Sequence, residues 1–191
     1  MTIPNLITIG RLFLVPIAIW LIVSRDFVSA FWIFILAGVS DGVDGFLARQ
    51  FNMRSVLGSY LDPLADKALL VSIYLTLAVI GDIPVWLTIL IVSRDVLIVG
   101  GVLLAGLLGQ PMAMKPHIVS KINTAAQIVL AGLVLGDLAF TPDLVMFRLV
   151  MIYVVGLLTL ASALVYVIDW VRHMGAADHA EGEGSDEGRV I

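Results

Sequence analysis

Cysteine is absent from this sequence and charged residues are scarce, since Asp, Glu, Lys and Arg together make up only 14% of the chain. The absence of cysteine excludes disulfides and thiol chemistry. Hydrophobic residues instead reach 60%, and the mean hydropathy is +1.06, well above the range of soluble domains. The apolar residues fall in long runs, and a helix that spans a bilayer needs about 20 of them. The composition therefore predicts a polytopic membrane protein whose partner is the lipid bilayer and not nucleic acid.

Short polar segments divide the sequence into six hydrophobic runs. These segments combine Gly, Pro, Asn or Asp with charge, as connections between helices do. We therefore predict an all-α membrane domain over residues 1–173, in which the first helix is retained and not cleaved as a signal. Its six transmembrane helices are expected at about 6–23, 28–49, 57–79, 84–108, 118–136 and 144–170.

The C-terminal segment, residues 174–191, differs from the rest of the chain in composition. From Asp178 onward it holds five acids and one base, which account for the formal net charge of −4. The remaining chain is balanced, so the acidity carries no information about ligands of the membrane domain. Because the segment is rich in Gly and lacks aromatic residues, it is predicted to be a disordered acidic tail.

Basic residues alternate between the connections in a way that predicts orientation. They flank the second and fourth connections and follow the last helix, at Arg49, Arg54, Lys115, Lys121 and Arg172. The third and fifth connections have none, and only Arg25 in the first connection opposes the trend. The positive-inside rule then places both termini in the cytoplasm. We expect a multi-pass protein of the cytoplasmic membrane, with residues 49–58 facing the cytoplasm.

Four aspartates lie where apolar helices are expected. Asp41 and Asp44 fall in the last turns of the second helix, and Asp62 and Asp66 in the first turns of the third. Spacings of three and four residues put each pair on one helical face, and a short connection makes the two helices antiparallel neighbours. Carboxylates so close together repel unless a cation neutralises them. The pattern therefore predicts a cytoplasm-facing site for one or two hard cations such as Mg²⁺, Mn²⁺ or Ca²⁺.

Small residues accompany the aspartates, namely Gly42, Gly45 and Ala48. They fit either close helix packing or a slot for a flat ligand. Divalent ions in an open pocket bridge phosphate oxygens and promote in-line displacement, and a spare carboxylate can accept the proton of an attacking hydroxyl. Residue chemistry alone thus indicates metal-dependent phosphoryl-type transfer on a lipid. A carboxylate-based ion transporter, which also buries acids in the membrane, stays open as the alternative.

The spacing of the charged segment resembles the signature of the CDP-alcohol phosphatidyltransferase family. The eight matching positions are Asp41-x2-Asp44-Gly45-x2-Ala48-Arg49-x8-Gly58-x3-Asp62-x3-Asp66. The resemblance implies a bundle of six membrane helices, often a homodimer, for residues 3–170. It further implies transfer of a phosphatidyl group from CDP-diacylglycerol to an alcohol, with release of CMP.

By this resemblance, Asp41, Asp44 and Asp62 would hold Mg²⁺ or Mn²⁺, as one or two ions. Asp66 would be a further ligand and the catalytic general base.

The resemblance also implies a nucleotide site. Gly45 and Ala48 would line the cytidine slot, and Arg49 would contact the nucleotide phosphates or fix the aspartates. Asp41 and Asp62 would border the nucleotide as well.

The acceptor is expected to involve two other places. Arg94 and Asp95 lie well inside the fourth helix, either as a local ion pair or with Arg94 anchoring an acceptor phosphate. Lys121 and Asn123 open the fifth helix. These places resemble the CMP-forming cardiolipin synthases of the family, which use phosphatidylglycerol.

The alternative acceptor is glycerol 3-phosphate, which phosphatidylglycerophosphate synthases use. Those enzymes tend to carry a second lysine where this chain has Asn123. Fewer cations suit a phosphodiester lipid better than a phosphomonoester, although Arg11, Arg54 and Lys67 are further cations that could supply the missing charge. Phosphatidylglycerol is therefore the favoured acceptor.

Overall fold

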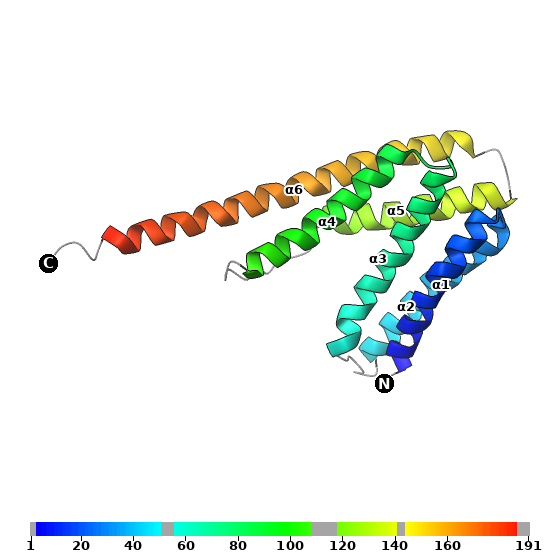
Figure 1. Cartoon of the computed structure of the whole chain (residues 1–191), viewed down its shortest axis with the longest axis horizontal. Helices are drawn as coiled ribbons and strands as arrows, with labels where there is room; N and C mark the ends of the chain where they lie inside the picture. The colour runs from blue at the N-terminus through cyan, green and yellow to red at the C-terminus, as the bar shows by residue number, and fades with distance from the viewer. Residues whose placement is uncertain (1–2, 51–55, 108–117, 141–143, 187–191) are drawn as a thin grey trace.

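The computed structural model describes the backbone of residues 3–50, 56–107, 118–140 and 144–186. It describes side chains within 8–43, 65, 67–101, 118–140, 144–169 and 171. Six α-helices and no strands lie in these ranges (Figure 1), so the all-α prediction is confirmed there. The helices are α1 (Ile3–Val23), α2 (Phe27–Gln50), α3 (Val56–Val79), α4 (Val85–Leu107), α5 (Ile118–Phe140) and α6 (Val145–Asp186).

The helices form one bundle in which α1 runs beside both α2 and α3 (Figure 1). α1 packs against both α2 and α3, α5 packs against α2 and α6, and α4 packs against α3 and α6. The N-terminus, the last turns of α2 and the first turns of α3 lie at the same end of this arrangement (Figure 1). The segments that carry the four aspartates are therefore brought to one end of the bundle.

The longest helix, α6, extends beyond the other five toward the C-terminus (Figure 1). It was expected to end near residue 170 and instead continues to Asp186. The helix passes residues 173 and 174 without a break. The division into a membrane domain and a disordered tail stays a prediction.

Close contacts between aromatic rings and glycines join the helices. On α5, Gly132 and Gly136 face Phe34 and Phe31 of α2, and a Cβ added at either glycine would lie 3.3 Å from the ring. Small residues allow membrane helices to approach in this way, since lipid supplies no hydrophobic drive for their association. The α2–α5 contact forms one side of the cavity described below.

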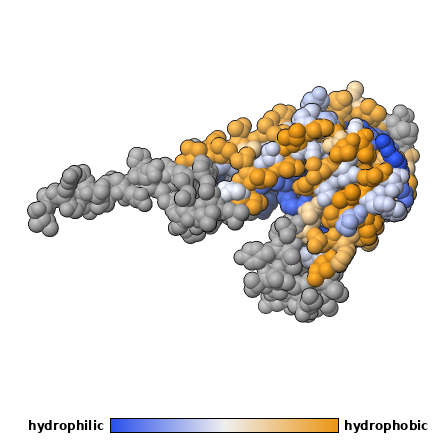
Figure 2. Space-filling model, viewed as in Figure 1, coloured by the Kyte–Doolittle hydropathy of each residue, from blue (hydrophilic) through white to orange (hydrophobic). Residues whose placement is uncertain are grey.

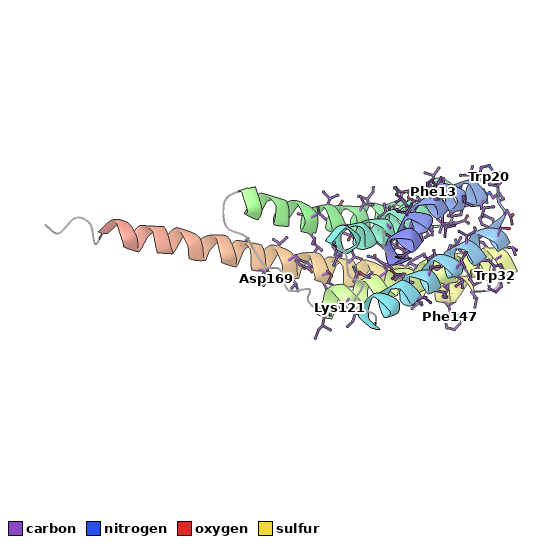
Figure 3. All side chains as sticks on the ribbon, turned by 90° about the horizontal axis from the view of Figure 1, so that it is seen from below. Phe13, Trp20, Trp32, Lys121, Phe147 and Asp169 are labelled. Atoms are coloured by element: carbon purple, nitrogen blue, oxygen red, sulfur yellow. The ribbon has the colours of Figure 1, made fainter. Side chains whose placement is uncertain are left out.

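On the face of the bundle shown in Figure 2, much of the described surface is apolar. Ile118–Phe140 and Val145–Asp169 are long and apolar enough to cross a membrane. Large aromatic residues are among the exposed side chains, and Trp20, Trp32 and Phe147 lie toward one end of the bundle (Figure 3). Exposed aromatic residues near helix ends are typical of the membrane–water interface.

Tight connections join α1 to α2 and α3 to α4, at the end of the bundle opposite the four motif aspartates. Asp26 accepts a hydrogen bond from the backbone N–H of Ser29 at 3.2 Å, which caps the first turn of α2. Gly81 adopts a φ of 89° between α3 and α4, a conformation that glycine takes at little cost. These short connections make α1 with α2, and α3 with α4, antiparallel neighbours.

Candidate active site

A buried arginine holds the first aspartate of the motif. Arg11 on α1 donates from Nη1 to Oδ1 of Asp41 on α2 at 2.7 Å. The arginine side chain is 1% exposed, whereas the aspartate is 46% exposed. A charge buried among apolar helices is costly unless it is paired. The pair therefore fixes the Asp41 carboxylate at the boundary between the buried bundle and an open cavity.

That cavity has a volume of about 520 Å³ and lies among α1, α2, α3 and α5. Arg11, Asp41, Lys67 and Thr124 supply its polar groups. Apolar side chains form most of the remaining wall: Phe34, Ile35, Ala37, Val39, Leu69, Leu70 and Ile128. A cavity that combines charged groups with mostly apolar walls suits an amphiphile with an anionic headgroup.

The other motif residues lie on the helices predicted for them. Asp44, Gly45, Ala48 and Arg49 belong to the last turns of α2, and Gly58, Asp62 and Asp66 to the first turns of α3. Their side chains lie outside the described part of the chain, so the convergence of the four carboxylates stays a prediction. Within the described residues, no group of three or more His, Cys, Asp or Glu side chains could hold a metal ion.

The described part of the site fits a hard cation as far as it extends. Only Oδ1 of Asp41 is hydrogen-bonded to the described protein, and the half-exposed side chain lines the cavity. A carboxylate oxygen that faces an open space is a suitable ligand for Mg²⁺ or Mn²⁺. Asp41 is therefore positioned to serve as one ligand of the expected set.

Arg94 lies in a dense set of polar contacts within the bundle. Its side chain is 4% exposed, and Nη1 donates to Asp95 Oδ1 at 2.8 Å. Nε and Nη2 donate to Ser162 Oγ at 3.2 and 2.8 Å, and Nη2 also donates to Ser120 Oγ. The guanidinium carbon lies 5.6 Å from the centre of the Tyr166 ring. These contacts tie α4 to α5 and α6, and the role of Arg94 as an acceptor anchor stays a prediction.

Lys67 contacts Asp95, and the sequence alone indicated no definite role for this lysine. Its Nζ donates to Oδ1 and Oδ2 of Asp95 at 2.8 and 2.7 Å, and its side chain lines the cavity beside Asp41. Asp95 is 28 positions away along the chain. The only sequence signal for a role of Lys67 is its place directly after Asp66, inside an expected membrane helix where charged residues are unusual.

The two remaining acceptor candidates on α5 differ in burial. Lys121 is exposed (Figure 3), whereas Asn123 is fully buried and accepts a hydrogen bond from Thr159 Oγ1 at 3.0 Å. The Asn123 amide nitrogen and the whole amide of Gln127, one turn further, have no hydrogen-bond partner among the described residues. Neither Lys121, Asn123 nor Arg94 lines the described cavity, and their role in acceptor binding is untested.

Known proteins resemble this chain along most of its length. The family model described as CDP-alcohol phosphatidyltransferase matches residues 1–168. Human cardiolipin synthase (CMP-forming) is 40% identical over 147 residues, which cover 69% of this chain and 49% of that protein. The chain spans about half the length of the human and rat cardiolipin synthases that it matches.

Relatives that are named for another activity match at similar identity. The chloroplastic CDP-diacylglycerol–glycerol-3-phosphate 3-phosphatidyltransferase 1 of Oryza sativa subsp. japonica is 35% identical over 188 residues, covering 89% of this chain and 57% of that protein. The CDP-diacylglycerol–glycerol-3-phosphate 3-phosphatidyltransferase of Bacillus subtilis is 36% identical over 154 residues, covering 72% and 78%.

The family match covers the six-helix region that carries the cavity, and it confirms the resemblance indicated by the eight-residue motif. This chain belongs to the CDP-alcohol phosphatidyltransferase family, a family of integral membrane proteins.

Proposed function

We propose that this protein transfers a phosphatidyl group from CDP-diacylglycerol to an alcohol and releases CMP. One observation carries the proposal: Arg11 holds Asp41, the first residue of the complete family motif, at a cavity that combines charged groups with mostly apolar walls. Such a cavity suits a lipid with a phosphate headgroup. A bilayer-embedded site also allows the lipid to enter from the side while the nucleotide leaves to water.

A metal site completes the proposal, because the family is generally metal-dependent. Asp41, Asp44, Asp62 and Asp66 would hold Mg²⁺ or Mn²⁺, as one or two ions. Bound there, the metal would neutralise charge on the phosphates that react. Asp66 would accept the proton of the attacking hydroxyl as general base, since a carboxylate within hydrogen-bond reach can serve in that role.

The nucleotide would lie along the last turns of α2 and the first turns of α3. Gly45 and Ala48 would leave room for the cytidine, with Asp41 and Asp62 at its edge. Arg49 would contact its phosphates, as guanidinium groups readily do.

Phosphatidylglycerol is the proposed acceptor, which makes cardiolipin the product. The human relative with 40% identity bears the name cardiolipin synthase, and the apolar wall of the cavity suits acyl chains. Lys121 and Asn123 would recognise the acceptor headgroup, and Arg94 would act on it through its contact with Asp95. Glycerol 3-phosphate is the second candidate, because the rice and Bacillus relatives are named for it.

The setting proposed for this reaction is a homodimer in the cytoplasmic membrane. Both termini and the active site would face the cytoplasm. The alternation of Lys and Arg among the connections supports this orientation, which also gives the site access to a nucleotide-linked donor.

The decisive experiment offers purified protein in vesicles CDP-diacylglycerol, Mg²⁺ or Mn²⁺, and one acceptor at a time. We expect CMP release with phosphatidylglycerol and cardiolipin as the lipid product. Phosphatidylglycerophosphate formed from glycerol 3-phosphate would instead establish the second candidate. A cation flux through the vesicles without CMP release under either acceptor would favour the ion transporter and overturn the proposal.

A further inference from the structure

Lys67 is positioned at the cavity with spare capacity to bind a ligand. Its ammonium has three N–H donors, and its hydrogen bonds in the described structure are the two to Asp95. The side chain is 38% exposed and lines the cavity together with Arg11 and Asp41. The ammonium is therefore held in place while a part of it still faces the space that a substrate would occupy.

The charges around Asp95 do not cancel. Arg94 and Lys67 both donate to this one carboxylate, at 2.8 Å for Arg94 Nη1 and 2.7 Å for the shorter Lys67 contact. Among the described residues, these two cations and one carboxylate leave one excess positive charge. Arg94 is 4% exposed and Lys67 38% exposed, so the excess charge is presented to the cavity by Lys67. A positive charge in surroundings of low polarity attracts an anion more strongly than it would in water.

The Arg94 contacts explain why the lysine is held firmly. Arg94 lies on α4, and its guanidinium donates hydrogen bonds to Ser120 on α5 and Ser162 on α6. The side chain is therefore held between three helices. Arg94 in turn orients Asp95, and Asp95 orients Lys67. Arg94 does not line the cavity, so its effect on a ligand there is transmitted through the other two residues.

We infer that Lys67 binds a phosphate oxygen of a lipid substrate, and that Asp95 and Arg94 are its positioning residues. This inference rests on the proposed function, because that function brings phosphates to the cavity. Lysine binds phosphate as a point charge. The shared chemistry belongs to two sources, the diphosphate of CDP-diacylglycerol and the phosphodiester of the acceptor lipid.

The lack of cysteine in the chain permits a clean chemical test. In Lys67→Cys, the KM for the substrate whose phosphate contacts Lys67 should rise about ten- to a hundredfold, as expected for loss of a hydrogen bond to a charged group. Aminoethyl methanethiosulfonate adds an ammonium to the new thiol and should reverse most of the increase in KM. Methyl methanethiosulfonate attaches through the same kind of disulfide but adds a neutral group, so it should not lower the KM. Equal recovery with both reagents, or an unchanged KM, would overturn the inference.

Protection of the thiol distinguishes the two phosphate sources. Vesicles containing CDP-diacylglycerol or phosphatidylglycerol are tested separately for slowing the labelling of Lys67→Cys, against vesicles of a zwitterionic lipid. Protection by the first assigns Lys67 to the donor, and protection by the second assigns it to the acceptor. Since labelling needs no turnover, this measurement remains valid if the proposed transfer fails. Absence of protection by both lipids would refute phosphate binding at Lys67.

Three further variants separate binding from folding. Arg25→Cys replaces an exposed arginine in the connection between α1 and α2 with a thiol. This variant should leave KM unchanged and be labelled equally with or without lipid.

Asp95→Asn should raise the same KM as Lys67→Cys, with little change in kcat. Its effect should vanish in Lys67→Gln, because positioning has no target there. Additive effects of the two changes would contradict the positioning role of Asp95.

Discussion

The indole ring of Trp86 on α4 lies against Gly156 on α6, where an added Cβ would be 3.0 Å from two ring carbons. The same ring is tilted toward Tyr153, with ring centres 6.1 Å apart. Glycine at this position lets a large aromatic side chain lie between the two helices. The distance between α4 and α6 thus depends on the missing side chain at one residue.

Gly156→Ala should therefore destabilise the bundle. The added methyl group forces the indole or a helix to shift, and overpacking of this kind costs about 1–3 kcal/mol. Thermal unfolding in detergent should show a lower Tm. Gly100→Ala on α4 is the matched control, because its Cβ would meet nothing within 4 Å, and we expect an equal or higher Tm. Equal melting of the two variants would refute the contact.

Tyr74→Phe should weaken the contact between α3 and α5. The buried Tyr74 hydroxyl donates to the backbone carbonyl of Gln127 at 2.9 Å, and loss of such a bond costs about 1 kcal/mol. The measurement is the free energy of unfolding in a mild detergent. Tyr153→Phe changes an exposed tyrosine on α6 and serves as the control. A larger loss in the control would contradict the prediction.

Asp66→Asn should abolish turnover while the protein stays folded. Asparagine keeps the size of the side chain and removes its capacity to accept a proton, so CMP release should fall at least about a hundredfold, the lower range for general base catalysis. Asp26→Asn is the control, since asparagine also caps a helix well and Asp26 caps α2 away from the site. Normal turnover in Asp66→Asn would remove Asp66 from the base role.

Arg11→Gln should lower both stability and activity. Asp41 would lose its 2.7 Å partner and with it a fixed orientation at the cavity. Because Asp41 is half-exposed, water compensates in part, and we expect a loss of about 1–3 kcal/mol. Arg11→Lys should recover a part of both properties by returning the charge. The checks are Tm and CMP release, and a variant with unchanged activity would show that Asp41 needs no partner on α1.

The helices were predictable because their physical signal is local. Apolar runs interrupted by polar segments gave six helices, and most ends agree with the structure to within a few residues. The end of α5 differs, since the segment from 136 onward was expected to be a connection and the helix continues to Phe140. Asp137 is buried there, accepts the N–H of Leu144 and lies 3.6 Å from Arg148. The partners of Asp137 lie in the segment that follows α5. The polar residues from 136 onward therefore wrongly indicated that the helix had already ended.

The candidate site was predictable only in its spacing. The motif predicted which turns of α2 and α3 carry the aspartates, but it held no information on Arg11 as the partner of Asp41. The pairing of Lys67 with Asp95 also escaped prediction. In both cases the partners are about thirty positions apart, and no periodicity within one helix indicates such a contact.

The bond between Arg11 and Asp41 has a consequence for how the protein enters the bilayer. A lone arginine or aspartate near the middle of a membrane helix costs about 2.5–3.5 kcal/mol on insertion scales. α1 and α2 are consecutive and joined by a short turn, so together they form a helical hairpin in which these two charges neutralise each other. The hairpin can therefore insert as an electrically balanced unit, in which Asp41 is already paired with Arg11.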